Sequence, residues 1–371
     1  MIFKGLEGVK VCKTSICYMD GSNGRLFYRG IPVETLADKS SFEEVAYLLW
    51  YGKLPTKSQL EEFKSKFSRN RDLSPESLEI LFKLPKNLHY VDVLKIFLSI
   101  HGSVDNGEED LQEKAIKIAS VFPTILAYYY RYSNDLELIP PREDLPHIEN
   151  FYHMVFGKRD GYLRALESAF ILLMEQDLNA STFTAMVIGS TLSDLYSCIV
   201  GALGALRGPL HGGACEKVPP MLEEIGSEDK VEEYVQRCLA EKKKIMGFGH
   251  RIYKTYDPRA VYLRDTIQRL FPDNKLFKIA KRLEEYIVGN RIKNIYPNVD
   301  LYSSIFFEAM GFPRSMFTAL FAMARVVGWT AHVIEYVSDN KLIRPESEYV
   351  GPMDVEYIPI ERRDEDGKDS H

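Results

Sequence analysis

Apolar residues recur every three or four positions along most of this chain, which is the spacing of an amphipathic α-helix. Ser41, Thr56 and Ser74 each precede such a stretch and are suitable N-cap residues. Alternating polar and apolar residues are scarce, and residues 25–29 are a short candidate strand. The pattern therefore predicts an all-α protein, with later helices over residues 110–131, 160–176, 182–206, 228–244, 259–271, 275–288 and 313–338.

Segment 182–206 is apolar on nearly all sides and contains one charged residue, Asp194. Its length would also suit a membrane span. Small residues recur at every fourth position of the segment, which would let another backbone approach one face closely (Gly189, Ser193, Ser197, Gly201 and Ala205). Because no second span and no aromatic belt accompany it, we expect a buried helix at a subunit or domain interface and no membrane partner.

Composition narrows the class of protein. With 371 residues, 45% of them hydrophobic, the chain can form one large domain and a smaller one. A net charge of -6 argues against a nucleic-acid partner, since such proteins normally carry a basic surplus. The N-terminus has no apolar signal segment, and the five cysteines form no CxxC pair, so we expect a cytoplasmic protein with reduced thiols and no zinc site (Cys12, Cys17, Cys198, Cys215 and Cys238).

The first segment with candidate chemistry reads GPLHGG over residues 208–213. A helix should end at Gly208-Pro209, and another should begin after the glycines. His211 would then lie near a helix N-terminus, where the macrodipole favours a neutral ring that can donate a hydrogen bond. The alternative is a histidine that only satisfies backbone groups of the loop.

The second segment reads GFGHR over residues 247–251. Glycines on both sides of Phe248 would let the backbone approach a ligand closely. Residues 241–264 contain seven basic and two acidic residues, in a chain that is negative as a whole. Such a local surplus suits a polyphosphate ligand, although a solvated basic face would look the same.

The third segment reads PNVDLY over residues 297–302. Asp300 precedes an apolar helical stretch, so it could be an N-cap or a general base. Other catalytic templates are missing: the sequence contains no GxSxG, GxxxxGK[ST], GxGxxG or HExxH motif. The histidines include no pair four residues apart, so no helical metal face is predicted.

Taken together and in this order, the three segments resemble the citrate synthase family. The longer matching stretches read GPLHGG, IMGFGHRIYKTYDPRA and YPNVDLYS, with TSICYMDGSNGRLFYRG before them and FAMARVVGWTAHVIEY and LIRPESEYVGP after them. The resemblance covers residues 9–352 and is greatest to the short prokaryotic and archaeal form. It implies an all-α, two-domain homodimer, with a large domain of residues 1–215 and 313–371 and a small closing domain of residues 216–312.

The resemblance also implies an activity, the condensation of acetyl-CoA with oxaloacetate followed by hydrolysis to citrate and free CoA. Asp300 matches the family's base, His211 the donor to the enolate oxygen, and His250 the group that polarises the keto carbonyl. Oxaloacetate would be bound by Gln176, Arg259, Arg325 and Arg344, with Arg344 coming from the other subunit of a shared site. Coenzyme A would lie along Ile245, Met246, Gly247, Phe248 and Gly249, with Arg251 and Lys254 at its phosphates. The thioester is a substrate, so neither a cofactor nor a metal is implied.

The sequence departs from the family pattern at four places. Gln176 stands where a histidine is usual, Cys215 replaces an asparagine, and Ser304 replaces a glycine. Pro219-Pro220 would interrupt the helix after His211, where an interior proline costs about 3 kcal/mol. Two alternatives therefore stay open: a 2-methylcitrate synthase that uses propionyl-CoA, and a non-catalytic relative that binds CoA or a dicarboxylate.

Overall fold

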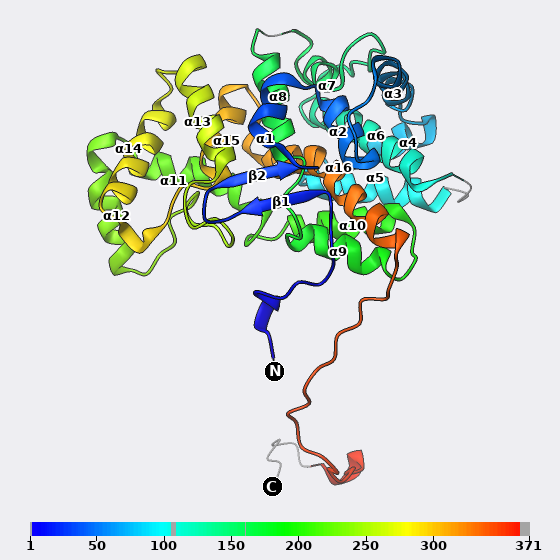
Figure 1. Cartoon of the computed structure of the whole chain (residues 1–371). Helices are drawn as coiled ribbons and strands as arrows, with labels where there is room; N and C mark the ends of the chain where they lie inside the picture. Colours follow the sequence, from blue (N-terminus) through cyan, green and yellow to red (C-terminus); the bar gives the residue numbers. More distant parts are fainter. Residues whose placement is uncertain (1, 105–108, 160, 364–371) are drawn as a thin grey trace.

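The structure is a computed structural model that describes residues 2–104, 109–159 and 161–363. Within these residues it contains sixteen α-helices and one small sheet (Figure 1), so the all-α prediction is confirmed. The three predicted N-caps are also confirmed. The Ser41 side chain accepts a hydrogen bond from the Glu44 amide, Thr56 forms a capping box with Gln59, and Ser74 caps the helix that begins at Pro75.

One group of helices surrounds the long helix α16 and forms the larger part of the molecule (Figure 1). The group comprises α1 (Val33–Lys39), α2 (Phe42–Tyr51), α3 (Lys57–Arg69), α4 (Pro75–Leu81), α5 (Tyr90–Val104), α6 (Leu111–Ser133), α7 (His147–Phe156), α8 (Leu163–Leu173), α9 (Ala180–Gly189), α10 (Leu195–Leu206) and α16 (Phe317–Ser338).

A second group gathers at the opposite side, on the left in Figure 1. It comprises α11 (Val218–Ile225), α12 (Val231–Ala240), α13 (Pro258–Leu270), α14 (Lys275–Gly289) and α15 (Val299–Ala309). Short 3-10 helices connect or flank the elements: η1 (Lys4–Leu6), η2 (Gly212–Lys217), η3 (Glu228–Lys230), η4 (Ile292–Asn294), η5 (Arg314–Met316) and η6 (Ile360–Arg362).

The sheet contains the predicted strand and two that the sequence pattern missed. Its order is β1 (Cys17–Asp20), β2 (Arg25–Tyr28) and β3 (Ile31–Pro32), all antiparallel. Cys17 pairs with Tyr28 and Asp20 with Arg25, and the Asp20 carboxylate accepts the amides of the turn between the strands. The turn also contacts the loop before α13, because the Gly21 carbonyl accepts the Lys254 amide at 2.9 Å.

The prediction of a single helix over residues 182–206 is wrong. The chain forms α9 and α10, separated by residues 190–194, and the Asp194 side chain caps α10 by accepting the Ser197 amide at 2.8 Å. The small residues do permit close approach, but between elements of one chain. A Cβ at Gly201 would overlap Ile188 of α9, and a Cβ at Gly189 would lie 2.9 Å from Val333 of α16.

The expected interruption at Pro219-Pro220 is also wrong. The helix α11 begins at Val218, so both prolines lie in its first turn. Amides in the first turn of a helix have no intrahelical acceptor, and proline loses nothing there. The predicted penalty for an interior proline therefore does not apply.

The helix α16 is the centre of the larger group. It packs against α2, α5, α6, α8, α9 and α10. Among the described residues, the stretch Arg314–Ser338 is long and apolar enough to cross a membrane, but 94% of its most apolar window is buried inside the protein. This is the burial of a core helix.

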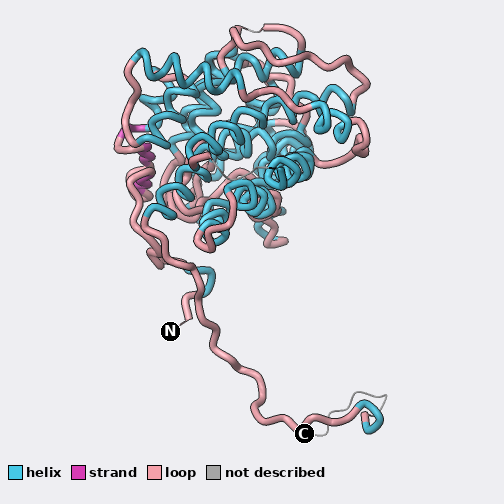
Figure 2. Tube along the Cα trace, turned by 90° about the vertical axis from the view of Figure 1, so that its right-hand side faces the viewer, coloured by secondary structure: helices cyan, strands magenta, loops and turns pink. Residues whose placement is uncertain are grey.

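After α16 the chain leaves the body of the molecule. Residues 339–359 run as an extended segment away from the helices, and Figure 2 shows the same separation from the side. We call residues 339–359 the C-terminal arm. Asn340 and Ile343 are hydrogen-bonded to Ser190, and Ile343 is partly buried. The other side chains of the arm are exposed, including several large apolar ones (Leu342, Tyr349, Val350, Met353, Val355 and Tyr357).

Candidate active site

A cleft of ≈ 1950 Å³ lies where the two groups of helices meet the sheet and the N-terminal segment. It brings together twelve of the fourteen residues predicted from the sequence, namely His211, His250, Asp300, Gln176, Arg259, Arg325, Ile245, Met246, Gly247, Phe248, Gly249 and Arg251. The other two lie elsewhere. Lys254 does not line the cleft, and Arg344 is exposed on the C-terminal arm.

His211 immediately precedes η2, and its ring is fixed by a serine of α9. The Nε2 atom lies 2.8 Å from Ser181 Oγ, which also accepts the indole N–H of Trp329 at 3.0 Å. No partner of His211 Nδ1 is recorded in the described part of the chain, so this nitrogen is available to a ligand. Burial, with a smaller effect of the Arg325 charge, lowers the pKa of His211 to about 4.

Burial favours the neutral ring that the sequence predicts for His211. The element after it is a six-residue 3-10 helix that runs directly into α11. Burial removes water from the imidazolium and thereby disfavours the charged form.

His250 lies in the loop before α13, and its tautomer follows from two backbone donors. The amides of Ile252 and Tyr253 both donate to Nδ1 at 3.1 Å. An Nδ1 that accepts hydrogen bonds has no proton, so a neutral ring carries its proton on Nε2. Burial and the charge of Arg259 lower the pKa of His250 to about 4, which keeps the ring neutral near pH 7.

Gln176 is the neighbour of His250 Nε2. One amide atom lies 3.3 Å from that nitrogen and also contacts Met19 Sδ. The other, assigned as Oε1, is buried and has no partner within the described part of the chain. Two N–H groups cannot bond to each other, and the amide oxygen and nitrogen are exchanged by a half-turn. The hydrogen-bond chemistry therefore assigns Gln176 Oε1 as the acceptor of the His250 Nε2 proton.

Asp300 is the second residue of α15, so the N-cap interpretation of this residue is wrong. The cap is Asn298, whose side chain accepts the Asp300 amide at 3.0 Å. No donor to the Asp300 carboxylate is recorded among the residues that the structure describes. Burial raises its pKa to about 7, with Asp257 adding to the rise and Arg259 and Arg325 opposing it.

Two buried arginines give the cleft its positive charge. Arg259 is held by Asp257, with Nε 3.0 Å from Oδ1 and Nη2 2.7 Å from Oδ2. Arg325 extends from α16 and donates from Nε to the Leu173 carbonyl at 2.6 Å. Within the described residues no acceptor is recorded for its two Nη atoms, so they are free to bind a carboxylate from the cleft.

The loop 245–249 is bound to the segment that leads to Asp300. The Gly249 amide donates to the Tyr296 carbonyl at 2.8 Å, and the Asn298 amide donates to the Gly247 carbonyl at 2.9 Å. Gly247 has a φ of 78°, and a Cβ there would lie 2.9 Å from the Cα of Leu301. Glycine is therefore required where the loop crosses α15.

The basic residues of this region are arranged differently from the prediction. Arg251 lines the cleft and donates to the Gly5 carbonyl at 3.0 Å, whereas Lys254 points to the Arg251 carbonyl. Sequence reasoning counted Lys243 and Lys244 in the basic surplus but did not place them at the ligand, and both line the cleft. Lys10, Lys217 and Lys293 also line it and were missed because they are distant in the sequence.

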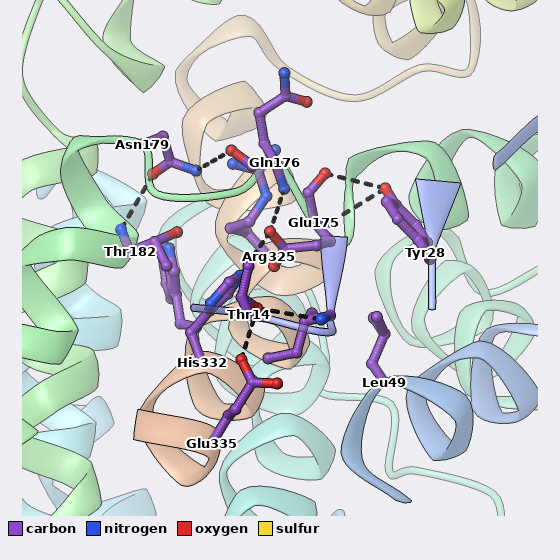
Figure 3. Close-up of polar contacts among 12 residues, drawn as sticks. Thr14, Tyr28, Leu49, Glu175, Gln176, Asn179, Thr182, Arg325, His332 and Glu335 are labelled. Carbon is purple, nitrogen blue, oxygen red and sulfur yellow. Dashed lines mark hydrogen bonds and ion pairs between the residues drawn. The ribbon is translucent and has the colours of Figure 1, made fainter. Parts of the chain in front are cut away.

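Several residues that support the site were missed as well. Figure 3 shows Gln176, Glu175, Arg325 and His332 within one group of polar side chains. A spacing of three or four residues between Arg325, Trp329 and His332 was visible in the sequence, but their partners on other elements were not. Over the described ranges, no group of three or more His, Cys, Asp or Glu residues is placed to hold a metal ion.

Comparison with known proteins finds relatives along almost the whole chain. The family model described as citrate synthase, C-terminal domain, matches residues 5–346. The citrate synthase of Deinococcus radiodurans is 41% identical, over 98% of this chain and 99% of that protein. The 2-methylcitrate synthase of Shewanella oneidensis is 37% identical, over 97% of this chain and 97% of that protein.

Two solved structures are similar over the same length. The crystal structure of citrate synthase from Thermotoga maritima MSB8 has 77% sequence identity and a TM-score of 0.94, covering 98% of this chain and 100% of that one. The ternary complex of citrate synthase from Thermoplasma acidophilum with carboxymethyl coenzyme A and oxaloacetate has 35% identity and a TM-score of 0.93, covering 98% and 100%.

Proposed function

Because this chain belongs to the citrate synthase family, we propose that it condenses acetyl-CoA with oxaloacetate and hydrolyses the product to citrate and free CoA. The family resemblance and the fold class predicted from the sequence are thereby confirmed. One observation supports this reaction more than the other observations do. A carboxylate with a raised pKa lines the same cleft as two neutral histidines and two buried arginines.

In this proposal Asp300 removes a proton from the methyl group of acetyl-CoA. That proton is weakly acidic, so the negative charge that develops on the thioester oxygen must be stabilised at the same moment. His211 supplies a hydrogen bond to that oxygen from Nδ1, the nitrogen that has no partner among the described residues. For that tautomer the Ser181 hydroxyl, which donates to Asn179 Oδ1 at 2.7 Å, has to turn its proton to His211 Nε2 instead.

The resulting enol carbon attacks the keto carbon of oxaloacetate. The His250 Nε2 proton, which Gln176 Oε1 accepts in the empty site, turns to the keto oxygen, polarises it and is then given to the new alkoxide. Arg259 and Arg325 bind the two carboxylates of the substrate, because a guanidinium binds carboxylate with two hydrogen bonds and stays charged at every working pH. Water then cleaves the thioester, which releases citrate and CoA.

We propose that coenzyme A lies along the loop 245–249, whose glycines let the backbone reach the ligand. Arg251 remains a candidate for its phosphates, and Lys243 and Lys244 are added because they line the same cleft. Lys254 would have to leave its bond to the Arg251 carbonyl to take part.

The experiment that tests the reaction is a thiol-release assay on the purified protein. Free thiol should appear from acetyl-CoA only when oxaloacetate is present, since the attacking carbon needs a keto acceptor. A folded protein that releases no thiol from any short acyl-CoA would exclude catalysis and leave the alternative of a CoA-binding or dicarboxylate-binding relative.

The same assay decides between two acyl groups. A 2-methylcitrate synthase is among the relatives at 37% identity, so propionyl-CoA is the alternative substrate. Comparing kcat/KM for acetyl-CoA and propionyl-CoA at saturating oxaloacetate separates the two activities. A higher kcat/KM with propionyl-CoA would mean that propionyl-CoA, and not acetyl-CoA, is the substrate.

We also propose that two copies form a homodimer with shared sites. The C-terminal arm exposes apolar side chains that would be more stable if covered, and a second copy of the chain is the proposed cover. Arg344 lies on this arm and would reach the oxaloacetate site of the partner. In the same proposal residues 216–312, which include α11–α15, form the smaller domain, and the protein is cytoplasmic.

A mixed-dimer experiment tests the shared site. Subunits with Arg344→Ala and subunits with His250→Ala should each be nearly inactive alone. After random exchange, half of the dimers would contain one of each, and one of their two sites would be intact, so activity should return to about one quarter of wild type. If mass spectrometry verifies that subunits have exchanged and activity still does not recover, each site is complete within one chain.

The glutamine at position 176 leads to a separate prediction. A protonated histidine would form a charge-assisted bond to a substrate carboxylate of about 1.5–3 kcal/mol, against about 0.5–1.5 kcal/mol for the neutral amide. Gln176→His should therefore lower the KM for oxaloacetate about three- to tenfold, with little change in kcat. Gln236→His, on the exposed face of α12, is the matched control. An unchanged or higher KM would instead indicate a pocket shaped for another 2-oxo acid.

A further inference from the structure

One face of α16 supplies the supports of the substrate site. Gly328 and Trp329 lie three or four residues from both Arg325 and His332, so the four residues share one side of the helix, and all are buried. Arg325 is the residue of this face that reaches the cleft. Figure 3 shows His332 below Arg325, next to Glu175.

His332 and Glu175 form a buried ion pair. His332 Nε2 lies 3.0 Å from Glu175 Oε1, and both side chains are almost completely enclosed. Burial alone would lower the pKa of His332, but the Glu175 carboxylate and the charges of Asp177 and Glu335 together raise it above its ordinary value. Glu335 is itself held by the hydroxyls of Thr14 and Ser15.

The pair is connected directly to the backbone of Gln176. Glu175 Oε1 accepts the Gln176 amide at 2.8 Å, and the Glu175 amide donates to Tyr28 Oη at 3.1 Å. The next residue, Asp177, has a φ of 50°, an uncommon conformation for a residue with a side chain. Side-chain contacts therefore hold the chain at the point where it presents Gln176 to His250.

The position of the Glu175 side chain costs folding free energy that a purely structural residue would not need to lose. Its Oε2 atom is buried and has no hydrogen-bond partner among the residues that the structure describes. The carboxylate fits only because position 328 is glycine: a Cβ there would overlap Glu175 Oε2 and lie 2.5 Å from the Met174 carbonyl oxygen. A buried ion pair with an unpaired oxygen is often no more stable than an apolar substitute.

We propose that Glu175 and His332 are positioning residues for the 2-oxo acid: together they fix the backbone that places Gln176 against His250 beside Arg325. This inference rests on the proposed function, because it assumes that oxaloacetate binds between Gln176, Arg259 and Arg325. The pair contacts the site through the Gln176 amide and acts on Arg325 by charge, so we expect it to affect substrate binding and not the proton transfer by Asp300.

The test compares substitutions in the pair with a matched control. His332→Phe removes the donor and keeps a planar ring, whereas His332→Gln keeps an N–H group that can reach Glu175. Gly328→Ala displaces Glu175 by adding one methyl group. Gly289→Ala is the control, because Gly289 is also helical and a Cβ there would meet nothing within 4 Å.

Oxaloacetate and, separately, CoA are titrated into each variant by calorimetry, and KM and kcat are measured with both substrates. His332→Phe and Gly328→Ala should weaken oxaloacetate binding about tenfold or more, the usual effect of removing a residue that orients a ligand-binding group. CoA affinity should change less than about twofold, and His332→Gln should recover most of the loss. Gly289→Ala should match wild type.

A folded His332→Phe or Gly328→Ala protein with wild-type oxaloacetate affinity would overturn the proposal, as would equal weakening of both ligands. If neither variant folds, Glu175→Gln is judged by the same criterion, since it keeps the shape of the side chain. The calorimetric measurement does not require turnover. A wild-type protein that releases no thiol would therefore count against the proposed function, and unchanged oxaloacetate binding in the variants would count against the positioning role.

Discussion

Replacing Asp300 by asparagine should lower kcat by about 10²–10⁴-fold, the range that a positioned general base contributes. Asparagine has nearly the same shape and cannot accept the methyl proton. Oxaloacetate binding should stay within about twofold of wild type, because the base acts on the acyl partner and the arginines are unchanged. Calorimetry for oxaloacetate and the thiol-release rate for acetyl-CoA measure the two effects separately.

The control for this variant is Asp273→Asn. The Asp273 side chain is 96% exposed and pairs with Lys278. The wild-type enzyme gives an independent check through pH. Since burial raises the pKa of Asp300 to about 7 and only the carboxylate form is a base, kcat/KM for the acyl-CoA should rise with pH and level off above about pH 7. A flat profile between pH 5 and 8, or equal losses of binding and rate in Asp300→Asn, would mean that Asp300 only stabilises the loop.

The second large effect is expected at His211. His211→Ala should reduce kcat about 10²- to 10³-fold, because one preorganised donor to a developing oxyanion contributes about 3–4 kcal/mol. The KM for oxaloacetate should change little, since its carboxylates are assigned to other residues. Steady-state kinetics with both substrates varied test this separation.

His153→Ala is the matched control, because His153 lies in α7 and does not line the cleft. A His211→Ala enzyme that keeps wild-type kcat would show that His211 only satisfies loop backbone groups. That outcome would also remove the role assigned to Ser181, which contacts the same ring.

Short-range signals in the sequence predicted what depends on neighbours in the chain. Caps such as Ser41 and Thr56 were correct because the bonds they form span three residues. The glycines at 247 and 249 correctly indicated a loop with unusual backbone angles beside a ligand cleft. Both signals require only the local chain.

The wrong predictions depend on contacts between distant elements or on boundaries between equally apolar segments. Residues 182–206 are apolar throughout, so periodicity could not show that Asp194 caps a second helix. The proline pair was misjudged because its effect reverses when α11 begins at Val218. The partners of Ser181, Asp257 and Glu175 lie on other elements, and no local pattern identifies them.

The central position of α16 limits how the enzyme can acquire new specificity. Arg325, Trp329 and His332 are core residues of this helix as well as supports of the cleft, so changing them alters packing and ligand recognition together. The loops 208–211 and 245–249 also line the cleft but lie outside the α-helices, so their residues other than His211 and Gly247 tolerate exchange more readily. Divergence toward another acyl group should therefore proceed through these loops, while the helix that holds the arginine is inherited almost unchanged.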